Sequence, residues 1–238
     1  MIKVITSKDN QRIKFAASLK ENKYRKIHKM YLAETKKSLE MAISANVVKE
    51  VFTLEYLNIP EDIPQYLVSE EVIKKLSSNV NPEGVVFIAE MKEIEVNNPS
   101  KILYLEEITD PGNMGTIIRT ALAFSYDLVL LSENCVSIYN EKVINSSKGA
   151  IFMMPVKKGR IQDYKKDHKV IVSTLSKESI SLEEVKAPEK FILVLGNESR
   201  GVSTEISKLA DIKVKILINN IDSLNVSVAG GILMNKIH

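Results

Sequence analysis

Residues 191–201, FILVLGNESRG, place five consecutive apolar residues directly before a turn that holds two glycines and several polar side chains. A short, uninterrupted apolar run is typical of a strand that is buried on both faces of a parallel sheet. Ligands bind at the carboxyl ends of the strands in such sheets, so this turn is a candidate for the chemistry of the protein.

Apolar segments of the same kind recur through the C-terminal part of the chain. Strands are predicted at 101–107, 128–132, 169–175, 191–196 and 212–218, with helices at 113–125, 140–148, 202–209 and 223–237. This alternation of buried strands and helices predicts an α/β fold with an open parallel sheet.

A region in which helical and strand patterns alternate precedes that sheet. The polar stretch 92–100 separates the two, which divides the chain into predicted domains 1–95 and 96–238. In the first domain, helices are predicted at 8–22, 36–45 and 70–77, and strands at 30–34, 50–54, 65–68 and 84–91. Thr35 and Ser69 precede two of these helices and are candidate caps. The pattern indicates a small α/β domain.

Composition narrows the class of protein. The 238 residues are 45% hydrophobic and 26% charged, which is ordinary for a soluble globular protein. No apolar run has the length of a membrane helix, and the N-terminus lacks the apolar core of a signal peptide. One cysteine, Cys135, and three histidines make a poor metal site. We therefore expect a cytoplasmic protein that uses neither a membrane nor a metal.

Positive charge is concentrated at the N-terminus. Residues 1–30 hold nine basic and two acidic side chains, a net +7, so the remaining chain carries −4 within the overall +3. Such a segment suits a polyanion partner, because lysine and arginine release counterions from phosphates. A solvated, lysine-rich helix face would have the same composition, and charge alone does not separate the two interpretations.

Two further turns have unusual sequences. The stretch 109–119, TDPGNMGTIIR, offers glycines and a helix N-terminus, which suit the close approach of an anionic group. Arg119 borders an apolar run, where an arginine that only faces solvent would be unexpected. It could instead form an ordinary ion pair with a carboxylate. The third turn follows Ile216-Leu217-Ile218 and contains SLNVSVA at 223–229, where Ser223 could cap the last helix. Each turn alone is a weak signal.

Taken in this order, the three turns resemble the motifs of the SpoU (TrmH-like) family, in the SPOUT class of RNA methyltransferases. The matching residues are Asn113, Gly115 and Arg119 in the first motif, Gly196, Asn197, Glu198 and Gly201 in the second, and the unchanged SLNVSVA in the third. The resemblance covers nearly the whole chain. Its N-terminal part, with YLAETKKSLEMA and NPEGVVFIA, is similar to the ribosomal-protein-like RNA-binding domain that many members carry.

The resemblance implies a fold and an activity. The sheet would end in a C-terminal trefoil knot, and the protein would transfer a methyl group from S-adenosylmethionine to a ribose 2′-hydroxyl. Ribosomal RNA is the preferred substrate because of the extra N-terminal domain, and transfer RNA is second. Members act as homodimers, in which the arginine of the first motif, here Arg119, reaches the site near the partner's cofactor.

The resemblance also implies site residues. The catalytic candidates are Arg119, Asn113, Glu198, Ser223 and Asn225. The candidates for cofactor binding are Thr174, Leu195, Gly196, Asn197, Ile216, Ile218, Leu224 and Asn225.

Some positions depart from the family pattern. Leu217 replaces a usual proline, Asn145 replaces an arginine, and Thr35 replaces the glycine that usually follows Glu34. The loss of arginine at 145 puts in doubt how substrate phosphate is held. Two alternatives remain open: a methyltransferase with a Rossmann-type loop at 109–115, and a catalytically silent RNA-binding protein. The first leaves 223–229 unexplained, and the retained Arg119 and Glu198 argue against the second.

Overall fold

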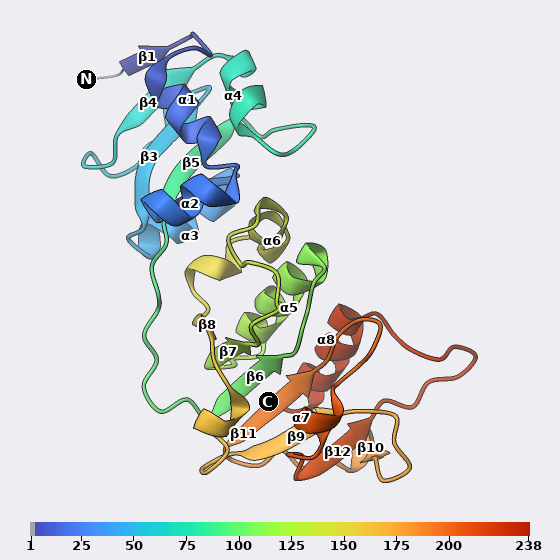
Figure 1. Ribbon diagram of the computed structural model, residues 1–238. Coiled ribbons are helices and arrows are strands. Elements are labelled where there is room, and N and C mark those ends of the chain that lie inside the picture. Colours follow the sequence, from blue (N-terminus) through green and yellow to red (C-terminus); the bar gives the residue numbers. More distant parts are fainter. Residues whose placement is uncertain (1–2) are drawn as a thin grey trace.

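The computed structural model describes residues 3–238, which form two sheets joined by an irregular segment, residues 91–100 (Figure 1). We call residues 3–90 the N-terminal unit and residues 101–238 the C-terminal unit. In the described part of the chain, no helix is both long enough and apolar enough to cross a membrane.

The N-terminal unit is a mixed, five-stranded sheet of order β1-β4-β3-β5-β2, with α1 and α4 packed together on one face. Its elements are β1 (Lys3–Ile5), α1 (Gln11–Ser18), α2 (Asn22–His28), β2 (Met30–Glu34), α3 (Lys36–Ser44), β3 (Val48–Thr53), β4 (Gln65–Val68), α4 (Glu70–Leu76) and β5 (Val85–Glu90). Thr35 caps α3 as predicted, because its hydroxyl accepts from the backbone N–H of Ser38. Ser69 occupies the cap position of α4 without a side-chain cap bond.

The helix predicted at 8–22 is present as the shorter α1, whereas α2, which begins at Asn22, was not predicted. The buried guanidinium of Arg25 donates to the carbonyls of Leu19 and Lys20, where α1 ends. Those carbonyls have no partner within the helix, so the arginine stabilises the break between the helices. The spacing of apolar residues in the sequence does not predict a contact between an arginine side chain and backbone carbonyls.

The C-terminal unit is a seven-stranded sheet of order β10-β12-β9-β11-β6-β7-β8, and every adjacent pair is parallel. Its elements are β6 (Lys101–Leu105), α5 (Pro111–Ala123), β7 (Leu128–Leu131), α6 (Glu141–Ser147), β8 (Val156–Lys158), β9 (Lys169–Ser173), β10 (Ile180–Ser181), β11 (Phe191–Leu195), α7 (Thr204–Ser207), β12 (Ile212–Lys215) and α8 (Val226–Lys236), with 3₁₀ turns η1 (Ala150–Phe152), η2 (Ile161–Asp163) and η3 (Leu182–Glu184). Helices α5, α6 and α8 cover one face, and α7 and η2 the other. The predicted parallel α/β sheet is confirmed.

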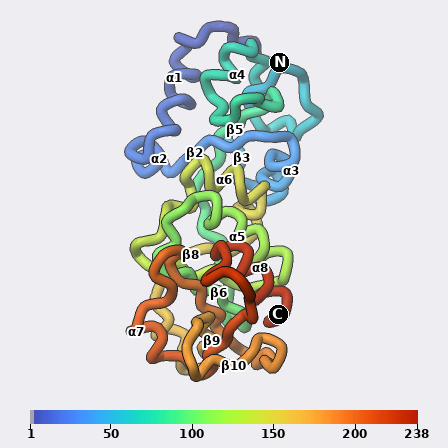
Figure 2. Tube along the Cα trace, turned by 90° about the vertical axis from the view of Figure 1, so that its right-hand side faces the viewer, coloured from blue at the N-terminus to red at the C-terminus, as the bar shows by residue number. Residues whose placement is uncertain are grey.

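The two units pack against each other through aromatic side chains. Phe152 of η1 lies between Tyr31 of β2 and Phe87 of β5, with ring centroids 6.3 and 6.0 Å away, and Tyr31 also contacts Tyr139 at 4.9 Å. Both views place α6 next to the N-terminal unit (Figure 2). The units therefore share one hydrophobic core.

A buried carboxylate adds a polar link at the same junction. Glu34, at the end of β2, is 6% exposed and accepts hydrogen bonds from Ser77 and Ser78. Asn145 of α6 donates its amide to Glu34 Oε1 at 3.1 Å and to Ser78 Oγ at 2.9 Å. Asn145, one of the positions that depart from the family pattern, thus faces the N-terminal unit at this contact.

Candidate active site

A cavity of about 390 Å³ lies at the carboxyl ends of β9, β11 and β12. Four segments line it: the end of β9 with the residues after it (173–175), the turn after β11 (195–202), the segment after β12 (215–218), and the start of α8 with the residues before it (223–229). Its volume lies in the range of about 300–1,000 Å³ that is usual for small-molecule sites. Its position at the strand ends agrees with the general location of ligands in open α/β sheets.

Seven of the eight residues predicted to bind a cofactor line this cavity. They are Thr174, Leu195, Gly196, Asn197, Ile216, Ile218 and Leu224. Asn225 is not among the lining residues. Its side-chain oxygen instead accepts from the backbone N–H groups of Ser227 and Val228, at 2.8 and 3.4 Å, and so caps α8. The predicted cap at Ser223 is wrong, because the helix begins at Val226.

The turn after β11 is folded tightly on itself. Asn197 and Gly201 exchange two backbone hydrogen bonds of 3.1 and 2.9 Å. A Cβ atom on Gly196 would lie 2.3 Å from backbone atoms of Gly201 and Val202, so only glycine fits there without moving the turn. Gly201 has φ +69°, in the left-handed region that glycine tolerates. The glycine spacing of this motif therefore has a steric cause.

Three of the predicted catalytic residues form one hydrogen-bonded chain beside the cavity. Glu198 accepts from the side-chain amide of Asn113 at 3.3 Å and from the backbone N–H of Asp110 at 3.2 Å. The Asn113 side-chain oxygen accepts from the amide of Asn225 at 3.0 Å. These contacts join the start of α5, the turn after β11 and the start of α8, so residues 112 positions apart meet at one place.

Local sequence explains why Asn113 lies there. Asp110 is the N-cap of α5, and its carboxylate accepts from the backbone N–H of Asn113 at 2.8 Å. Pro111 follows at the first helical position, where its missing N–H costs nothing. The sequence Asp-Pro-Gly-Asn thus starts the helix and places the Asn113 side chain beside Glu198.

Arg119 and Ser223 are not joined to this chain of hydrogen bonds. Arg119 is exposed on α5 and makes no ion pair or side-chain hydrogen bond within residues 3–238. Ser223 lines the cavity, is exposed, and makes no side-chain hydrogen bond to Asn113, Glu198 or Asn225. Within one chain, therefore, the predicted catalytic arginine does not meet the predicted catalytic carboxylate.

Sequence reasoning missed Glu107, which holds the turn over the cavity. Its carboxylate pairs with Arg200 at 2.5 Å and accepts from the Asn134 amide at 3.0 Å. Its backbone carbonyl accepts from the side-chain amide of Asn197 at 2.9 Å. The sequence offered one signal for it, the adjacent acids Glu106 and Glu107 directly after β6. That position is another strand end at the same edge of the sheet.

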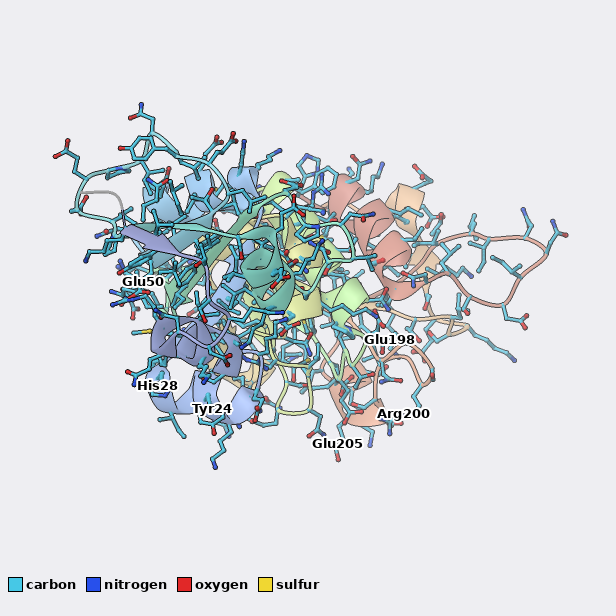
Figure 3. All side chains as sticks on the ribbon, turned by 90° about the horizontal axis from the view of Figure 1, so that it is seen from above. Tyr24, His28, Glu50, Glu198, Arg200 and Glu205 are labelled. Atoms are coloured by element: carbon cyan, nitrogen blue, oxygen red, sulfur yellow. The ribbon has the colours of Figure 1, made fainter. Side chains whose placement is uncertain are left out.

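Charged groups of both signs surround the cavity. Glu198, Arg200 and Lys215 line it, and Arg200 is paired with Glu107. Figure 3 shows Glu198, Arg200 and Glu205 on one side of the molecule. The Glu198 carboxylate stabilises a positively charged group of a ligand that lies beside it. Among residues 3–238, no group of three or more His, Cys, Asp and Glu side chains is arranged to hold a metal ion.

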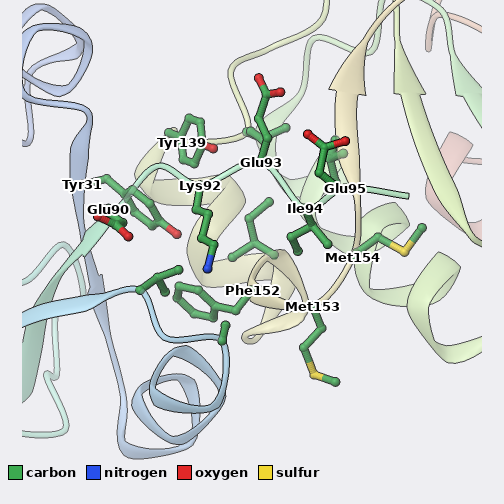
Figure 4. A pocket seen from close by; sticks show the side chains of 15 residues that line it. Tyr31, Glu90, Lys92, Glu93, Ile94, Glu95, Tyr139, Phe152, Met153 and Met154 are labelled. Carbon is green, nitrogen blue, oxygen red and sulfur yellow. The ribbon is translucent and has the colours of Figure 1, made fainter. Parts of the chain in front are cut away.

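A second cavity, of about 400 Å³, lies at the junction of the two units (Figure 4). Tyr31, Tyr139 and Phe152 line it, together with Glu93 and Glu95 of the connecting segment. It is as large as the first cavity, but none of the predicted site residues lines it. The cavity at the strand ends, which the predicted site residues line, is therefore the candidate active site.

Two family models match the chain. The model described as the SpoU rRNA Methylase family matches residues 100–235, and the model described as the MRM3-like substrate binding domain matches residues 10–87. The first match alone covers more than half of the chain, and it includes the whole of the cavity at the strand ends.

Full-length relatives and solved structures agree with these models. The 23S rRNA (guanosine(2553)-2'-O)-methyltransferase RlmP of Bacillus subtilis is 29% identical, over 98% of either chain. The crystal structure of an rRNA methyltransferase from Sinorhizobium meliloti has a TM-score of 0.88 at 25% identity, covering 99% of this chain and 96% of that one. An AdoMet-bound structure of rRNA methyltransferase from that organism has the same TM-score at 24% identity, covering 99% and 97%.

Proposed function

This chain belongs to the SpoU rRNA methylase family, and we propose that it transfers a methyl group from S-adenosylmethionine to a ribose 2′-hydroxyl of ribosomal RNA. The observation that carries this proposal is the hydrogen-bonded chain of Asn113, Glu198 and Asn225 beside a cavity of about 390 Å³. Transfer RNA is the second candidate substrate. We propose a cytoplasmic location, since ribosomal RNA is the preferred substrate.

The cavity fits S-adenosylmethionine in size. The tight turn at Gly196 brings main chain against the cavity, and Glu198 offers a carboxylate to the sulfonium cation. When bound, the cofactor supplies an electrophilic methyl group. The lining residues Thr174, Leu195, Ile216 and Leu224 would hold it in place. In-line attack by a hydroxyl oxygen depends mainly on such positioning.

The site residues then have separate roles. Asn113 and Asn225 hold the Glu198 carboxylate in a fixed direction, and Ser223 lies on the cavity wall where the ribose would enter. Arg119 would come from the second subunit, where its guanidinium stabilises negative charge that develops on the 2′-oxygen. In this arrangement the carboxylate orients the arginine of the partner chain.

Exposed apolar residues on α8 support a homodimer. Val228 and Ile232 are 52% and 39% exposed and lie four residues apart, on one face of the helix. Helix α8 packs against α5, which carries the exposed Arg119. A two-fold interface over these helices would bury the apolar face and bring each Arg119 toward the other subunit. We also propose that the segment after β12 forms the trefoil knot of the SPOUT fold.

The dimer can be tested by placing a charge in the proposed interface. Ile232→Glu should leave the protein largely monomeric at micromolar concentration in sedimentation experiments, and methyl transfer should fall with it. Val80→Glu is the matched control, because Val80 is 94% exposed in the N-terminal unit, far along the chain from α8. A monomeric Ile232→Glu protein with full activity would contradict the proposed role of the partner's Arg119.

Residues 1–95 form the proposed RNA-binding domain, and residues 96–238 the catalytic domain. The match of residues 10–87 to a substrate-binding model and the net +7 of residues 1–30 support this division. Phosphate contacts by lysine and arginine make the affinity for RNA depend on salt concentration.

The function is tested by incubating the protein with labelled S-adenosylmethionine and total RNA. Label is expected in ribosomal RNA, in alkali-resistant dinucleotides, because a 2′-O-methyl group blocks cleavage of the adjacent phosphodiester. Label in transfer RNA would establish the second candidate substrate, and alkali-sensitive label would refute ribose methylation. Cofactor binding without any transfer would identify a catalytically silent RNA-binding protein.

A further inference from the structure

Helix α2 presents two aromatic rings at the surface of the N-terminal unit. The rings of Tyr24 and His28 are nearly parallel, at 12°, with centroids 6.5 Å apart. Phe15 of α1 lies edge-on against His28, with centroids 5.0 Å apart. His28 is exposed and Tyr24 is half-buried. We call Tyr24 and His28 the α2 platform.

The α2 platform is surrounded by positive charge. Residues 20–29 contain five basic side chains and one acidic side chain, Glu21. The Lys23 ammonium lies 5.8 Å from the Tyr24 ring centroid, and Lys26 and Lys29 are exposed. Within residues 3–238, none of these three lysines pairs with a carboxylate. The charges are therefore available to an anion outside the chain.

Buried contacts hold α2 against the rest of the N-terminal unit. Arg25 anchors the helix to the end of α1, and Glu141 of α6 opposes the lowering of the Arg25 pKa that burial causes. Helix α2 thus lies close to the C-terminal unit. In the view from above, Tyr24 and His28 lie toward the left of the molecule, and Glu198 and Arg200 lie toward the right (Figure 3). An RNA that contacts both places would therefore have to cross the junction between the two units.

We propose that the α2 platform stacks an unpaired nucleobase of the RNA, outside the nucleotide that is methylated. This inference rests on the proposed function and names the form of RNA that the N-terminal unit selects. Aromatic rings beside lysines are the usual means of binding single-stranded RNA, because each base offers a π-face while the lysines meet the backbone. Paired bases within a helix are already stacked, so the platform favours a loop, bulge or end.

The test uses three probes of equal length: a single-stranded adenosine dodecamer RNA, the same sequence in a duplex, and an abasic oligonucleotide. His28→Ala should weaken binding of the single strand by about five- to a hundred-fold, as expected for the loss of stacking on one base. Binding of the abasic probe should not change. His28→Phe should keep wild-type affinity, because it retains a ring and removes any charge.

Lys23→Gln serves as the electrostatic control. It should weaken binding of all three probes by a similar factor and reduce the dependence of affinity on salt. Two results would overturn the inference: unchanged binding of the single strand by His28→Ala, or an equal loss on the abasic probe. Methyl transfer by the wild-type protein is measured separately, so failure of the proposed function is distinguished from failure of the platform.

Discussion

Replacing Arg119 by alanine is expected to lower the turnover of methyl transfer by roughly 10²–10⁴-fold. A guanidinium does not readily give up its proton, so it is a poor base, but its N–H donors stabilise developing negative charge well. Arg119 does not line the cavity at the strand ends, so the dissociation constant for S-adenosylmethionine should change little.

Single-turnover kinetics and a cofactor titration measure the two quantities separately. Arg160→Ala is the matched control, since Arg160 is an exposed arginine that pairs with Asp163 outside the site. It should leave both quantities unchanged. Near-wild-type turnover in Arg119→Ala would show that the site has been assigned to the wrong residue.

Mixed dimers test whether Arg119 acts across the interface. The second variant is Gly196→Ala, whose added Cβ would meet backbone atoms of Gly201 and Val202 and displace the turn over the cavity. Each variant should be inactive alone. A heterodimer of the two would hold one complete composite site, so mixing should restore part of the activity. No restoration, with heterodimers present, would place Arg119 in the site of its own chain.

The sequence predicted the C-terminal sheet well for a physical reason. Strands buried on both faces consist of uninterrupted apolar residues, and all five predicted strands are present with shorter carboxyl ends. Parallel strands also end at the same edge, so motifs far apart in sequence had to meet there. This explains why Asn113, Glu198 and Asn225 are neighbours. Strands β1, β8 and β10, of two or three residues each, carried no comparable pattern.

Other features depend on contacts that no local pattern encodes. The break between α1 and α2 is stabilised by Arg25. Helix α8 begins at Val226, so Asn225 and not Ser223 occupies its cap position. Asn145 appeared in the sequence as a lost phosphate ligand. In the structure its amide binds Glu34 and Ser78, so its side chain serves the contact between the two units.

That contact also changes how the N-terminal unit should be studied. The polar stretch 92–100 predicted two domains, and the segment 91–100 does join two separate sheets. Yet Tyr31 and Phe87 pack on Phe152 across the junction, so removing residues 1–95 would expose apolar surface of the C-terminal unit. Point variants on an intact chain, such as His28→Ala, are therefore better probes of RNA binding than a deletion.

The shared core gives the second large expected effect. Phe152→Ala should lower the free energy of unfolding by about 3–5 kcal/mol, the usual cost of removing a buried phenylalanine ring. Phe152 is 4% exposed, and its ring is in contact range of both Tyr31 and Phe87. The cavity of about 400 Å³ already adjoins the ring, so the substitution enlarges an existing space that neighbouring side chains cannot readily fill.

Denaturant unfolding of the wild-type and variant proteins measures this difference. Met153→Ala is the control, because Met153 is the next residue and is 53% exposed, so its loss should change the free energy of unfolding by less than about 0.5 kcal/mol. Phe152→Ala should also weaken RNA binding more than cofactor binding, since the junction sets where α2 lies relative to the cavity at the strand ends. A loss below about 1 kcal/mol for Phe152→Ala would mean that the two units hold together without this aromatic contact, and that the buried Glu34–Asn145 link carries the junction instead.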